Sequence, residues 1–293
     1  MSQKVAVAIV HGMGTADGDF ANESDPDKFA NGIAKRLKSR FSELMRETPE
    51  AVDAKLDIKA VYWAPVLHDL QDKLAERLEF DKLSNPLQIR DFVWHSLADA
   101  IAYQITSSNA SDRNIYHQIH GQFAATLQKL AENGGEKAPL CVIGHSLGSA
   151  IASNYIWDLQ NKKFKIKIGD SPLERGETLC LFYTLGSQIA LWGLRYHDFG
   201  TPVTIPSPQL QEHYPNLRGE WINFYDRDDI LGYPIKKMND KYQKAVTVDM
   251  EVNAGNALTS WNTLSHNAYW TDNDVVEPIS QALVRVWKSA YSG

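Results

Sequence analysis

The sequence has little cysteine, no long apolar run and no excess of basic residues, and each shortage argues against a class of function. Its two cysteines, Cys141 and Cys180, fall in predicted core strands, so we expect reduced thiols and no cysteine-based metal site. No apolar run reaches the roughly 18 residues of a membrane span. A net charge of -6 argues against a nucleic-acid partner.

The composition is that of one large globular domain. A chain of 293 residues with 43% hydrophobic content can bury a sizeable sheet, so we expect a single domain over residues 1–293. The first predicted strand starts near residue 4, which leaves no room for a signal peptide and predicts a cytoplasmic protein. No cofactor is expected, and no sequence feature defines an oligomeric state.

Residues 144–148 read Gly-His-Ser-Leu-Gly and directly follow the apolar run 140–143. Small residues on both sides of Ser146 let the backbone approach closely in a sharp turn between a strand and a helix. The helix predicted over 147–160 would then direct its first N–H groups, including that of Leu147, at the point above Ser146. The pattern predicts a nucleophilic serine, with a plain small-residue turn as the alternative.

A second motif lies at the end of the first apolar run, 5–10. It is followed by residues 11–14, which read His-Gly-Met-Gly. A His-Gly pair after a strand is typical of an oxyanion loop, because the glycines leave the Met13 N–H free to turn toward the same point as the Leu147 N–H. We interpret His11 as a residue that holds this loop by hydrogen bonds, and not as a catalytic base.

An acid and a histidine follow Ser146 in the sequence, each at a predicted strand end. The strand expected at 220–226 runs into a segment with three aspartates, Asp226, Asp228 and Asp229, and His266 follows the strand expected at 245–252. A serine nucleophile needs a base, and the base needs an orienting acid. A metal site at the three aspartates is the weaker interpretation, because such turns usually bond to themselves. No metal ligands are assigned.

With the order serine, aspartate, histidine, the chain resembles the α/β-hydrolase superfamily over nearly its full length, particularly its lipases and esterases. The run Asp-Ile-Leu-Gly-Tyr-Pro at 229–234 is similar to the layout around the acid in fungal triglyceride lipases. The resemblance implies that Asp229 is the acid, with Asp228 as the second candidate. It also implies that His266 is the base, and that the protein is a serine hydrolase acting on small-molecule acyl esters.

The alternation of elements predicts an α/β-hydrolase fold, with a mostly parallel central sheet of about six strands flanked by helices. The larger members of the family have eight strands, and the missing two would be the first pair. The predicted strands lie near 4–11, 57–63, 139–144, 178–185, 220–226 and 245–252, and the helices near 27–44, 147–160 and 275–291.

A helical insertion is predicted between the second and third strands. Residues 66–110 could form a cap near the active-site mouth, with Trp94 and Tyr103 available for apolar substrate contact, or they could be ordinary crossover helices. Ile189 and Trp192 follow another strand and could line a substrate pocket, or simply pack beneath a neighbouring loop.

Carboxylic esters are the substrate class that the motifs favour. Two alternatives stay open: a thioesterase that uses the same triad, and a non-catalytic binding protein on a hydrolase scaffold, since a fold does not guarantee its usual function.

Overall fold

The computed structural model describes residues 3–13, 17–84, 94, 98–103, 115–254 and 263–292. In this part of the chain, one sheet contains six strands in the order β2-β1-β3-β4-β5-β6, and every neighbouring pair is parallel. The strands are β1 (Val5–Val10), β2 (Leu56–Val61), β3 (Leu140–His145), β4 (Leu179–Leu185), β5 (Glu220–Tyr225) and β6 (Val248–Glu251). The prediction of an α/β fold with a parallel sheet of about six strands is confirmed.

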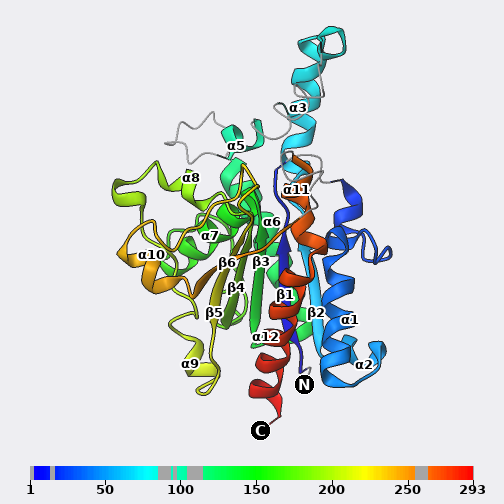
Figure 1. Cartoon of the computed structure of the whole chain (residues 1–293), viewed down its shortest axis with the longest axis vertical. Coiled ribbons are helices and arrows are strands. Elements are labelled where there is room, and N and C mark those ends of the chain that lie inside the picture. The colour runs from blue at the N-terminus through cyan, green and yellow to red at the C-terminus, as the bar shows by residue number, and fades with distance from the viewer. Residues whose placement is uncertain are drawn as a thin grey trace.

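Helices cover both faces of the sheet (Figure 1). The longer ones are α1 (Ile33–Met45), α3 (Pro65–Arg77), α6 (Ile115–Gly134), α7 (Leu147–Gln160) and α12 (Asn273–Tyr291). The shorter ones are α2 (Pro49–Asp53), α5 (Ala98–Ala102), α8 (Ile189–Gly193), α9 (Leu210–His213), α10 (Asp240–Ala245) and α11 (Thr263–Ala268). Helices α1 and α12 lie on one face of the sheet, and α6 and α7 lie on the other. Because the strands are buried on both sides, their sequences are continuous apolar runs.

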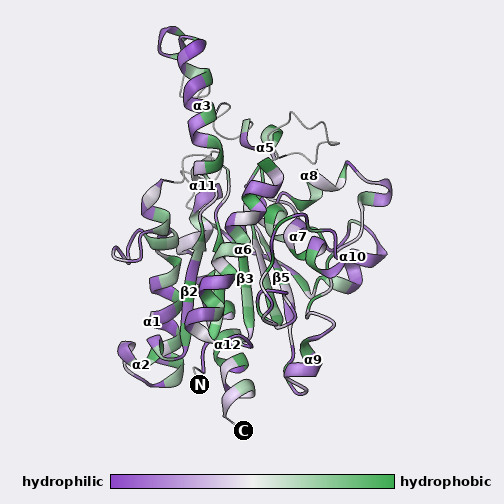
Figure 2. Cartoon of the chain, turned by 180° about the vertical axis from the view of Figure 1, so that it is seen from behind, coloured by the Kyte–Doolittle hydropathy of each residue, from purple (hydrophilic) through white to green (hydrophobic). Residues whose placement is uncertain are grey.

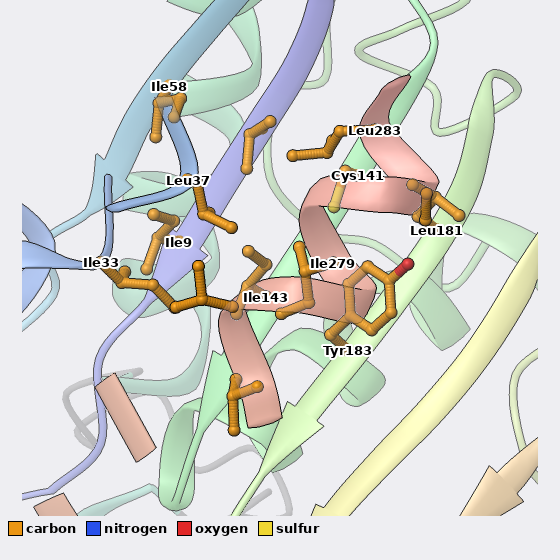
Figure 3. Close-up of a cluster of buried hydrophobic side chains, with 14 of the residues drawn as sticks. Ile9, Ile33, Leu37, Ile58, Cys141, Ile143, Leu181, Tyr183, Ile279 and Leu283 are labelled. Carbon is orange, nitrogen blue, oxygen red and sulfur yellow. The ribbon is translucent and has the colours of Figure 1, made fainter. Parts of the chain in front are cut away.

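The core divides into two clusters, one on each face of the sheet. Along β1, alternate side chains such as Ile9 pack against α1 and α12, as Figure 3 shows with Leu37 and Ile279. The intervening residues, such as Ala8, face the cluster formed with α6 and α7. This alternation is the two-residue period of a strand. Figure 2 shows strands that are largely hydrophobic and helices of mixed hydropathy around them.

Two predicted boundaries differ from the structure. The helix expected from residue 27 begins at Ile33, because Ala30 and Asn31 adopt left-handed φ angles of 49° and 54° that interrupt a right-handed helix. The last strand is only Val248–Glu251, since the residues before it form α10, where Asn239 caps the helix by accepting hydrogen bonds from two backbone N–H groups.

The chain between β2 and β3 contains α3, α5 and α6. Figure 1 shows α3 extending from the body of the molecule beyond the carboxyl ends of the strands. Its apolar face is buried at Leu67, but Leu74 and Leu78 are about half exposed. Much of the predicted cap at 66–110 lies outside the described residues. None of the helices among the described residues is long and apolar enough to cross a membrane.

Candidate active site

Ser146 occupies a strained turn between β3 and α7. Its φ of 54° and ψ of -125° lie outside the ordinary regions for a residue with a side chain, and its N–H donates to the carbonyl of Leu185 at 2.9 Å. The glycines on either side permit the turn. A Cβ on Gly148 would lie 2.3 Å from the carbonyl oxygen of His11, and one on Gly144 would lie 2.8 Å from the carbonyl oxygen of Gly148.

The loop after β1 lies against this turn. A Cβ on Gly12 would stand 2.6 Å from the Cβ of Ser146, so the loop backbone can lie this close only because residue 12 has no side chain. His11 fixes the loop to the chain that follows β2. Its Nε2 accepts hydrogen bonds from the N–H groups of Trp63 and Ala64 at 3.2 and 3.3 Å, and its ring stacks on Trp63. This is the structural role that the sequence predicts for His11.

Asp229, and not Asp228, faces His266. The Nδ1 of His266 lies 3.0 and 2.8 Å from the two carboxylate oxygens of Asp229. Because a carboxylate accepts, Nδ1 carries the proton and Nε2 is left as the basic nitrogen of the neutral ring. Asp228 is exposed, and its N–H donates to Asp226, which therefore serves to hold the turn.

Tyr269 also binds the Asp229 carboxylate. Its hydroxyl donates to Oδ2 of Asp229 at 2.9 Å and accepts from the N–H of Asp226. Burial alone would raise the pKa of Asp229, but the hydrogen bond and charge of His266, together with the Leu231 N–H and the Tyr269 hydroxyl, outweigh it and lower that pKa. Asp229 is therefore an anion at neutral pH, as an orienting acid must be.

His145 links His266 to the turn at Ser146. The Nε2 of His145 lies 2.5 Å from the carbonyl oxygen of His266, so it must be the donor, and the two rings are 4.7 Å apart. The Nε2 of His266 is buried and has no hydrogen-bond partner among the described residues. The Ser146 hydroxyl instead accepts a hydrogen bond from the side-chain amide of Gln188 at 3.1 Å.

One cavity lies beside α8, and another lies beside the loop after β1. Ile189 and Trp192 line one of about 240 Å³, together with Ala150 on the second turn of α7. The other, of about 320 Å³, is lined by Met13 and His145, among others. The prediction that Tyr103 is available for substrate contact is wrong. Its side chain is 1% exposed, and its hydroxyl forms hydrogen bonds with His120 and Asn154 in the core between α6 and α7.

The buried histidines predict a steep acid destabilisation. Burial lowers the pKa of His11 and of His145 to about 3, whereas the unfolded chain titrates at about 6.5. The folded state binds these protons more weakly, so the stability they contribute is complete above pH 6.5 and is lost as the pH falls toward 3. Between pH 7 and 5 each histidine should cost about 2 kcal/mol of unfolding free energy.

Urea unfolding at pH 7 and pH 5 measures this effect. In His145→Asn, whose side chain can still donate to a carbonyl, the loss of unfolding free energy between the two pH values should be smaller than in the wild type by about 2 kcal/mol. An identical pH dependence in both proteins would contradict the assignment of His145 as a neutral buried histidine.

Sequence reasoning missed three residues around the turn: Gln188, His145 and Tyr269. Gln188 directly precedes Ile189, one of the two predicted pocket residues that follow a strand at the carboxyl edge of the sheet, and that position was the available signal. His145 and Tyr269 carry no sequence signal of their own, because their partners are more than a hundred and about forty residues away respectively.

Comparisons with known proteins add little to this geometry. No family model and no curated protein matches the sequence. Among solved structures, the chain is similar to an esterase domain of a Rhodothermus marinus protein, with 11% identity, a TM-score of 0.38, and coverage of 100% of this chain and 89% of that one.

Among the described residues, no group of three or more His, Cys, Asp and Glu side chains could hold a metal ion.

Proposed function

We propose that the protein is a serine hydrolase that cleaves carboxylic esters through an acyl-enzyme on Ser146. The observation that carries the proposal is the buried contact of His266 Nδ1 with Asp229, which leaves Nε2 without a hydrogen-bond partner among the described residues. The His266 backbone is contacted by His145, the residue before Ser146 in its strained turn. A histidine held in one tautomer by an acid, together with a serine in a strained turn between a strand and a helix, is the arrangement that acyl transfer needs.

In the proposed reaction the Ser146 hydroxyl attacks the ester carbonyl while its proton passes to Nε2 of His266. The negative charge of Asp229 stabilises the imidazolium that results. The carbonyl oxygen takes the electron pair of the broken π bond and is bound by the N–H groups of Leu147 and Met13. His266 then protonates the leaving alcohol, and water releases the acid from Ser146 by the same steps.

The substrate is proposed to be a small-molecule acyl ester. The cavity beside α8 supports an apolar group on the substrate, because Ile189 and Trp192 line it and α8 begins one residue after Gln188, which contacts Ser146.

Intact-mass measurement after treatment with a fluorophosphonate tests the proposal, because this probe reports an activated serine whatever the substrate is. We expect one adduct on the wild type and none on Ser146→Ala. Circular dichroism of both proteins is the control that tests whether each is folded. A folded wild type that forms no adduct would contradict the proposal and favour a binding role on a hydrolase scaffold.

The leaving group is tested by comparing an ester with the acyl-CoA thioester of the same acyl chain. The proposal predicts the higher kcat/KM for the ester. A higher value for the thioester would make the protein a thioesterase that uses the same three residues.

A further inference from the structure

Gln188 presents a buried side-chain amide to the nucleophile. It follows β4 in the loop that leads to α8 and is 1% exposed. Its Nε2 donates to the Ser146 hydroxyl at 3.1 Å and approaches the sulfur of Met13 at 3.7 Å. The amide therefore lies between the reacting oxygen and the loop that carries one of the proposed oxyanion donors.

The backbone around Gln188 is fixed by a chain of buried hydroxyl groups. Ser149, on the first turn of α7, donates to the carbonyl of Ser146 at 2.6 Å, and its hydroxyl accepts from the Gln188 N–H at 3.3 Å. The Ser149 and Ser187 hydroxyls are 2.9 Å apart, and Ser187 also accepts from the N–H of Ile189. These bonds hold the Gln188 backbone relative to the nucleophile turn, so the side chain starts from a defined position.

We propose that the Gln188 amide is a third oxyanion donor, a catalytic group that leaves the Ser146 hydroxyl for the charged oxygen when the ester is attacked. This inference rests on the proposed function. In the attack the Ser146 Oγ bonds to the carbonyl carbon, the hydroxyl proton goes to His266, and the carbonyl oxygen becomes an anion on that same carbon.

The charged oxygen is the better acceptor for this amide. It is only two bonds from Oγ, so an N–H that already reaches Oγ can reach it with a small rotation of the side chain. A hydrogen bond to an anion is stronger than one to a neutral hydroxyl. The amide therefore binds the transition state more tightly than the ground state, which is the condition for it to raise kcat.

Gln188→Met tests the donor, because methionine has a similar length and no N–H group. With 4-nitrophenyl butyrate as the substrate, kcat should fall by about 10²- to 10³-fold with little change in KM, as expected for the loss of one oxyanion donor. The rate of fluorophosphonate labelling should fall as well, because the phosphoryl oxygen occupies the same site. Gln160→Met, the same substitution at the far end of α7, is the matched control and should react like the wild type.

The pH dependence of kcat in Gln188→Glu distinguishes a hydrogen-bond donor from a residue that only supports the fold. The ionised carboxylate accepts and repels the charged oxygen, whereas the protonated acid can donate to it. The ratio of kcat in Gln188→Glu to kcat in the wild type should therefore increase as the pH falls. A flat ratio, or a Gln188→Met kcat within threefold of the wild type, would overturn the inference.

The failures of the two proposals are distinguishable. If the wild type is labelled at Ser146 and Gln188→Met is labelled at the same rate, the serine hydrolase stands and Gln188 is not an oxyanion donor. If Gln188→Met raises KM and leaves kcat unchanged, Gln188 binds the ground state only, and the inference is again wrong. A folded wild type that reacts with neither probe overturns both proposals.

Discussion

Replacement of Ser146 by alanine should lower kcat for a reactive ester by about 10³- to 10⁶-fold. In the proposed reaction this hydroxyl forms the covalent intermediate, and it is the group that the side-chain amide of Gln188 contacts. Removal of His266 should cost a similar factor, and the double variant should be scarcely worse than either single one, because the two residues act as a unit.

Initial rates of 4-nitrophenyl butyrate hydrolysis for the wild type, Ser146→Ala, His266→Ala and the double variant measure this prediction. The unfolding midpoint of each protein in urea serves as the control for folding. Single-variant rates within tenfold of the wild type would contradict the assignment. Independent losses that multiply in the double variant would show that Ser146 and His266 do not act on the same step.

Substitution of Gly148 by alanine should destabilise the protein by about 3 kcal/mol or more. The added Cβ would lie 2.3 and 2.6 Å from the carbonyl oxygens of His11 and Val10. These are backbone atoms at the end of β1, and a strand buried on both faces cannot move aside without disturbing its neighbours on the sheet. The clash therefore cannot be relieved by rotating a flexible side chain.

Gly121 provides the matched control, because it lies in the middle of α6 and a Cβ there would meet no atom within 4 Å. Alanine at this position should stabilise the protein by about 0.5–1 kcal/mol, since glycine loses more conformational freedom in a helix. Urea unfolding of both variants measures the difference. Equal stabilities would show that the contact between α7 and β1 is not as close as the structure places it.

Much of the fold could be predicted from the sequence because the signals for it are local. The apolar run before Gly144 and the helical stretch after Ser146 define a strand and a helix that share one turn, and the crossovers between such strands predict a parallel sheet. The loop at His11 and Gly12 could be placed at the same edge, because the carboxyl ends of parallel strands meet there. Each of these inferences needs only neighbouring residues.

The choice between Asp228 and Asp229 was not available from local pattern alone. Both follow β5, and the structure shows that only Asp229 turns its carboxylate toward His266, while Asp228 lies in solvent. The direction of a side chain in an irregular turn depends on the hydrogen bonds of that turn, here those made by Asp226 and Tyr269. The resemblance to lipases pointed to Asp229, and its role as the acid stays a prediction.

Hydrophobic period and the small size of glycine were enough to predict the order of strands and helices along the chain, the sharp turn at Ser146 and the edge of the sheet that carries the candidate site. The contact of the Gln188 amide with the Ser146 hydroxyl, that of His145 with the backbone of His266 and the burial of Tyr103 became visible in the folded chain alone. Those contacts join residues that are far apart in the chain, and their geometry exists only after the strands and helices have packed.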